Sequence, residues 1–98
     1  MFSISYASDG EVLLKGRLDA SRVDEASAFL DVITETKRLN FQDLDYISSA
    51  GLGVLLRTQK RLSQSGHEIV LTHLNKMVRD VFKTARFDLI FKIEEVPA

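Results

Sequence analysis

The apolar residues of this chain switch repeatedly between the two-residue spacing of a strand and the three-to-four-residue spacing of a helix. Strands are predicted at residues 2–6, 11–18, 38–44 and 67–73, helices at residues 21–33, 50–65 and 76–85, and a short strand or extended tail at residues 89–93. A hairpin followed by alternating helices and strands is typical of an α/β fold. We therefore expect a mixed, partly parallel sheet of four to five strands with helices packed on it.

The size and charge of the chain narrow the class of protein. Its 98 residues suffice for one domain, which we place at residues 1–98. A formal net charge of −1 gives no general attraction to nucleic acid or anionic membranes. The chain has no cysteine, no segment resembling a signal peptide and no stretch near the roughly 20 apolar residues of a membrane span. These features predict a cytoplasmic protein without membrane insertion.

Several polar residues and glycines mark the ends of the predicted helices. Ser21, with Asp24 three residues later, resembles a capping box for the first helix. Gly66 is suited to the left-handed conformation that stops a helix, and Asn75 is suited to start the last one. The predicted helix boundaries rest on these residues.

Catalytic and metal-binding motifs are weak. A nucleophilic Ser48 or Ser49 would need a base, for which the chain offers only His67 and His73. Neither serine lies in a G-x-S-x-G elbow, and the glycines near them lack the lysine of a phosphate-binding loop. Two histidines six residues apart, without a matching carboxylate motif, do not define a metal site. We therefore expect neither an enzyme nor a cofactor or metal.

A row of basic residues on the last predicted helix allows a nucleic-acid-binding alternative. Lys76, Arg79, Lys83 and Arg86 are spaced so that they would lie on one helical face, where they could contact phosphates. An amphipathic helix needs a solvated face in any case, and the overall charge is balanced. We favour the solvated face and predict no nucleic-acid partner.

The segment DYISSAGLGVLL, residues 45–56, is the most informative part of the sequence. If the preceding strand ends near residue 46 or 47, then Ser48 or Ser49 falls at the N-cap of the next helix. A helix N-terminus also accommodates a phosphate group, and Ala50, Gly51 and Gly53 would let a partner approach closely. The residues alone favour capping, while a modified serine stays open.

The same segment resembles the STAS domain, the family of bacterial anti-sigma factor antagonists. In that family an apolar pair and an acid precede a phosphorylated serine, which is followed by a small hydroxyl residue, Gly-Leu and an apolar helix; the phosphorylated serine corresponds to Ser49. Residues 16–19, Gly-Arg-Leu-Asp, match a second family landmark, and residues 85–93 resemble its closing segment. The chain departs from the pattern at Ser48, which replaces the acid, and at Ala50, which replaces the second hydroxyl. Ser48 is then the competing acceptor.

The resemblance implies one STAS domain that regulates transcription by partner switching. The unphosphorylated protein would bind an anti-sigma factor that is a serine kinase, phosphorylation of Ser49 would release it, and a serine phosphatase would restore binding. The implied partner-binding residues are Asp19, Ser48, Ser49, Ala50, Gly51 and Leu52. The alternative is a constitutive interaction module, either a scaffold or an accessory part of a membrane transporter, and a weaker one is a domain that senses a ligand or nucleotide.

Overall fold

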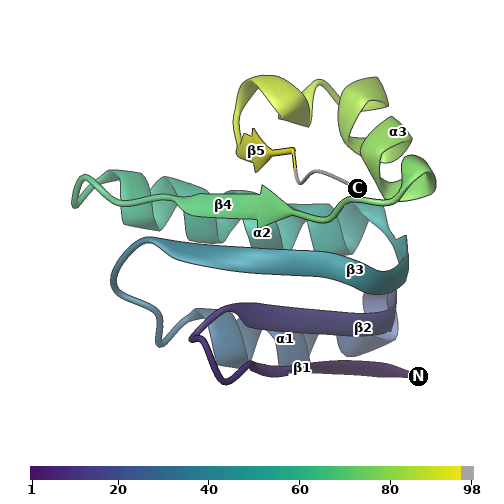
Figure 1. Cartoon of the computed structure of the whole chain (residues 1–98), viewed down its shortest axis with the longest axis horizontal. Helices are drawn as coiled ribbons and strands as arrows, with labels where there is room; N and C mark the ends of the chain where they lie inside the picture. The colour runs from purple at the N-terminus through teal and green to yellow at the C-terminus, as the bar shows by residue number, and fades with distance from the viewer. Residues whose placement is uncertain (96–98) are drawn as a thin grey trace.

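The computed structural model describes residues 1–95, which form one mixed five-stranded sheet with the strand order β1-β2-β3-β4-β5 (Figure 1). The strands are β1 (Phe2–Tyr6), β2 (Val12–Leu18), β3 (Lys37–Ile47), β4 (Ile69–Thr72) and β5 (Lys92–Glu94). β1 is antiparallel to β2, and every other neighbouring pair is parallel. The predicted fold class is confirmed, with five strands.

Helices connect the parallel strands. They are the 3-10 turn η1 (Ala20–Arg22), α1 (Val23–Leu30), α2 (Ser49–Ser63), α3 (Lys76–Thr84) and the 3-10 turn η2 (Phe87–Leu89). α1 and α2 contact each other and lie together behind the sheet in Figure 1, while α3 contacts β3. Within residues 1–95, none of the helices has both the length and the apolar composition needed to span a membrane.

A continuous apolar core joins the sheet to its helices. Leu18, Leu39 and Leu55 are completely buried, and each such side chain contributes about 1.5–3 kcal/mol through its removal from water. Phe82 of α3 packs edge-to-face on Phe41, with ring centroids 6.1 Å apart, and on Phe91 at 5.7 Å. This aromatic cluster joins α3 to β3 and to the segment that leads into β5.

The start of the first helix differs from the prediction. α1 begins at Val23 and has no side-chain cap, so the capping box of Ser21 and Asp24 is wrong. Asp19 instead caps η1 by accepting a hydrogen bond from the Ser21 N–H at 3.0 Å. The chain leaves β2 through the 3-10 turn η1, which precedes α1. The capping residue is therefore Asp19, two residues before Ser21. The other two signals are confirmed: Gly66 has φ of 77°, and Asn75 accepts from the Val78 N–H at 2.9 Å.

Only three of the four basic residues expected on one face of the last helix lie on α3. α3 ends at Thr84, and Arg86 follows it in a left-handed conformation with φ of 63°. Arg79 forms an ion pair with Glu95, and Lys76 lies 3.3 Å from an Asp80 carboxylate oxygen. Two of the four cations therefore have acidic partners within the chain, and a third lies outside the helix.

Candidate functional site

The carboxyl ends of two parallel strands bring the predicted site residues together. Leu18, the last residue of β2, pairs with Ile47, the last residue of β3. Asp19 and Ser48 follow directly, and the Ser48 N–H donates to the Leu18 carbonyl at 2.9 Å. η1 begins after Asp19 and contacts α2, which starts at Ser49. The carboxyl-terminal ends of β2 and β3 thus bring Asp19 and both serines together at one end of the sheet.

Ser48 caps α2. Its backbone is extended, with φ of −87° and ψ of 170°, as expected of an N-cap residue. The half-buried hydroxyl accepts from the Gly51 N–H at 3.2 Å, and the Ser48 carbonyl accepts from the Leu52 N–H at 2.9 Å. The choice between the two serines as the cap, which the sequence left open, is settled in favour of Ser48.

Ser49 has a different environment. It is the first residue of α2, and its side chain is exposed. Within residues 1–95, the N–H groups of Ser49 and Ala50 donate no hydrogen bond. Such free N–H groups at the start of a helix carry partial positive charge and stabilise a nearby anion. The position combines an accessible hydroxyl with a backbone that accommodates negative charge.

The two glycines of the motif have different roles. Gly51 is buried, and a β-carbon on it would lie 2.9 Å from side-chain atoms of both Ile47 and Leu18. Its missing side chain lets the first turn of α2 contact the strand ends. Gly53 is exposed, and a β-carbon there would meet nothing within 4 Å. Gly53 lies four residues after Ser49, about one helical turn away, so it is exposed on the same side of α2 as Ser49.

The remaining predicted site residues divide by burial. Ala50 is exposed beside Ser49, whereas Leu52 is buried, with only 7% of its surface accessible. Leu52 and Gly51 therefore support the surface from beneath, and their side-chain positions are not available to a partner in this conformation. The exposed part of the motif consists of Ser49, Ala50 and Gly53, which we call the motif surface.

Asp19 is held in its ionised form. The Ser21 hydroxyl donates to its carboxylate at 2.6 Å and the Ser21 N–H at 3.0 Å. The hydroxyl bond is the largest cause of a lowered pKa for Asp19, and the positive charges of Arg17 and Arg22 act in the same direction. The site therefore presents a fixed negative charge beside the start of α2.

The two histidines lie at opposite ends of β4. His67 Nδ1 accepts from the Thr36 N–H at 3.2 Å, and His73 Nδ1 lies 3.0 Å from the Thr72 hydroxyl oxygen. Both therefore contact threonines at the strand ends. No group of three or more His, Cys, Asp or Glu residues suited to a metal ion occurs within residues 1–95.

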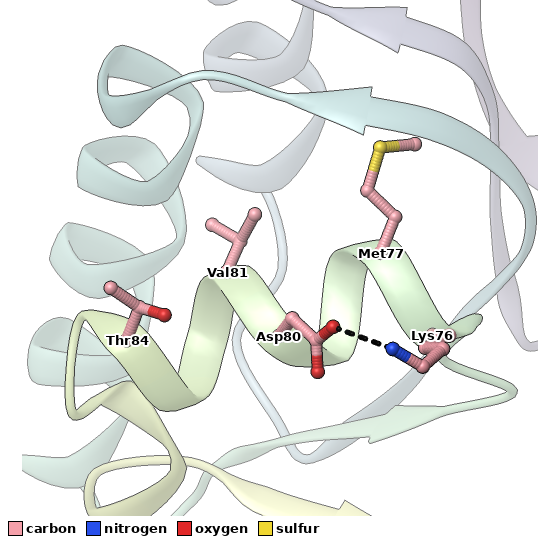
Figure 2. A pocket seen from close by; sticks show the side chains of 5 residues that line it. All are labelled: Lys76, Met77, Asp80, Val81 and Thr84. Atoms are coloured by element: carbon pink, nitrogen blue, oxygen red, sulfur yellow. Dashed lines mark hydrogen bonds and ion pairs between the residues drawn. The ribbon is translucent and has the colours of Figure 1, made fainter.

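A separate groove of about 590 Å³ lies along α3. Met77 and Val81 extend from one side of the helix in Figure 2, while Lys76 and Asp80 form an ion pair on its rim. Met77 is 53% exposed although it is a large apolar residue. The described lining contains none of the predicted site residues, so the groove is distinct from the motif surface.

Comparisons with known proteins agree on one family. The family model for the STAS domain matches residues 8–97. BtrV of Bordetella bronchiseptica, named as a candidate anti-sigma factor antagonist, is 47% identical over 55 residues, which are 56% of this chain and 47% of that protein. The aligned segment thus spans about half the length of this curated relative.

Solved structures extend the likeness to the whole fold. A candidate anti-sigma factor antagonist from Thermotoga maritima has a TM-score of 0.78 and 25% identity, over 99% of this chain and 87% of the other. The anti-sigma factor antagonist SpoIIAA in its unphosphorylated form has a TM-score of 0.76 and 21% identity, over 99% and 89% of the two chains. SpoIIAA of Bacillus in its phosphorylated form has a TM-score of 0.70 and 20% identity, over 99% and 92%.

Proposed function

The chain belongs to the STAS domain family, and from this premise we propose that it is an anti-sigma factor antagonist that acts by partner switching. In its unphosphorylated form it binds an anti-sigma factor that is also a serine kinase. Phosphorylation of Ser49 by that kinase ends the complex, and a separate serine phosphatase restores it. The kinase holds the nucleotide, so this chain acts as a regulator in the cytoplasm and not as an enzyme.

The observation that carries the proposal is that the two serine hydroxyls have different environments. The Ser48 hydroxyl is engaged with the Gly51 N–H and is half-buried, whereas the Ser49 side chain is exposed. A kinase must bring the acceptor oxygen to its bound nucleotide, which favours the exposed hydroxyl. Ala50 carries no hydroxyl. These environments support Ser49 as the acceptor and Ser48 as a weak competitor.

The phosphate would act differently in the free protein and in the complex. It adds about −1.5 to −2 charges at neutral pH. In the free protein the N–H groups of Ser49 and Ala50, which have no hydrogen-bond acceptor among the described residues, and the dipole of α2 can accommodate that charge. In a close interface the same charge must be desolvated or must meet like charge, so the complex weakens. A loss of about 3 kcal/mol would reduce affinity roughly hundredfold.

The partner-binding surface follows from the exposed and half-buried residues at the strand ends. We place Asp19, Ser48, Ser49 and Ala50 within it, with Gly51 and Leu52 holding the backbone beneath. The ionised Asp19 and the free N–H groups of α2 lie at the same sheet edge and offer a partner both hydrogen-bond acceptors and donors. SpoIIAA has this fold in both its unphosphorylated and its phosphorylated form, which supports a switch that leaves the fold intact.

The acceptor assignment is tested by incubating the protein with its cognate kinase and ATP and locating the phosphate by mass spectrometry. The Ser49→Ala variant should remain unmodified, while Ser48→Ala should still be phosphorylated. Phosphate confined to Ser48, or equal labelling of Ser49→Ala and the wild type, would contradict the assignment. Circular dichroism of both variants shows that they are folded.

A constitutive interaction module is the second candidate, and Ser48 favours it because a serine replaces the family's acid before the phosphorylated residue. In that role the protein would remain bound to a scaffold or a transporter without any phosphate. Stable co-purification with such a partner, together with unmodified Ser49 in cells, would support this alternative over the switch.

A further inference from the structure

Within residues 1–95, the outer strand β1 has an unpaired edge. It is the first strand of the sheet order, and no described element lies beyond it (Figure 1). The Arg17 N–H donates to the Met1 carbonyl, and the Ala7 N–H donates to the Glu11 carbonyl. Since hydrogen-bonded and non-bonded positions alternate along an antiparallel pair, the backbone groups of Phe2, Ile4 and Tyr6 point away from β2. Three residues therefore present free donors and acceptors at this edge.

The edge lacks the usual protection against pairing. Charges, proline, bulges or short length usually protect an exposed edge strand from pairing with another chain. β1 reads Phe-Ser-Ile-Ser-Tyr, which contains no charge and no proline, and its pairing with β2 runs without a register shift. The opposite edge, β5, has three residues and carries Lys92 and Glu94. Only β5 has the features of a protected edge.

The sequence of β1 is also nearly symmetric about Ile4. If two copies pair antiparallel with Ile4 opposite Ile4, then Phe2 faces Tyr6 and Ser3 faces Ser5 of the other copy. The same register joins the outward backbone groups of Phe2, Ile4 and Tyr6 to one another, so every free donor meets an acceptor. No like charges are opposed, because the strand has none.

We propose that β1 is a self-association edge, through which two copies of this chain form a two-fold dimer with one continuous ten-stranded sheet. The occupant is a second copy because the edge complements itself in backbone hydrogen bonds, side-chain size and charge. Tyr6 stacks on Phe29, with ring centroids 4.9 Å apart, yet is 50% exposed. The neighbouring copy covers this exposed surface.

The dimer leaves the motif surface free. A two-fold axis at Ile4 reverses the direction of the second sheet, so the carboxyl ends of β2 and β3 lie at opposite ends of the assembly. Ser49 of each copy remains exposed beyond the sheet ends. The dimer thus presents two independent partner-binding surfaces, and its formation does not depend on the proposed phosphorylation.

Two double variants with two new charged residues each test the pairing. Ser3→Lys with Ser5→Lys places the introduced lysines opposite each other across the two-fold axis and should raise the dimer dissociation constant roughly tenfold or more. Ser3→Lys with Ser5→Glu places opposite charges together and should keep the dimer. Sedimentation velocity over a concentration series measures both. A wild-type protein that stays monomeric, or equal dissociation of the two variants, would overturn the proposal.

Cysteine cross-linking tests the register even if the lysine variant fails to fold. The chain has no cysteine of its own. Ser3 faces Ser5 at a position where Cα atoms are about 4.5 Å apart, close enough for a disulfide. Under mild oxidation, Ser3→Cys protein mixed with Ser5→Cys protein should give a cross-linked dimer, and each protein alone should give far less. Equal cross-linking in all three samples would exclude this register.

Discussion

Gly51 lies so close to Leu18 that a β-carbon on it would be 2.9 Å from the Leu18 Cγ atom. The two residues come from α2 and β2, and their contact seats the first turn of the helix on the ends of the parallel strands. The position of Ser49 at the surface depends on this contact, because a bulkier residue at Gly51 would push the helix start away from the sheet.

Gly51→Ala should destabilise the fold by about 1–3 kcal/mol, since Leu18 and Ile47 are both buried and must shift to admit the methyl group. Gly53→Ala is the matched control in the same helix. It meets nothing within 4 Å and should stabilise the protein by up to about 1 kcal/mol through its helix propensity. Urea unfolding measures both changes, and equal effects of the two substitutions would contradict the packing argument.

The two serines should differ in stability as well as in phosphorylation. Ser48→Ala removes the hydroxyl that accepts from the Gly51 N–H and should cost about 1 kcal/mol of unfolding free energy. Ser49→Ala alters an exposed side chain and should change that free energy by no more than about 0.5 kcal/mol. Thermal and urea unfolding of the pair would identify the capping residue. A larger loss of unfolding free energy in Ser49→Ala than in Ser48→Ala would show that Ser49, and not Ser48, caps α2.

Asp19 should make the stability of the strand-end turn depend on pH. Its pKa in the folded protein is lowered below the ordinary value of 3.8, chiefly by the Ser21 hydroxyl. The stabilising contribution is therefore present above pH 3.8 and is lost as the pH falls through the lowered pKa. Titration of the Asp19 carboxyl carbon by NMR should show the low pKa. Ser21→Ala should raise it toward 3.8, and an unchanged pKa in that variant would exclude the hydroxyl as the cause.

A negative charge at Ser49 should weaken partner binding. Ser49→Asp is expected to raise the dissociation constant for the cognate anti-sigma factor at least roughly tenfold, or ~1.4 kcal/mol, because the charge enters the proposed interface. Ser8→Asp is the control, since Ser8 is exposed in the turn between β1 and β2, at the other end of the sheet. Isothermal titration calorimetry compares them. Equal affinity of both variants and the wild type would count against the switch.

The sequence by itself determined the order of the elements and the class of the fold. Apolar spacing reports which face of a segment is buried, and this local property sufficed to predict the N-terminal hairpin, the parallel strands and the alternating helices. The cap at Asn75 and the stop at Gly66 were also predictable, because each depends on residues within the same turn.

Tertiary structure decided which serine caps α2 and which acidic partner Arg79 meets. Ser48 becomes the cap because β3 continues to Ile47 and the Ser48 N–H bonds to Leu18 of the neighbouring strand. Arg79 meets Glu95 only after the chain has turned through η2 and β5. Such pairings join residues that are distant in sequence, so no local pattern encodes them. The chain therefore carries its fold in local spacing, while the environment of Ser49 arises only when two strand ends and a helix meet.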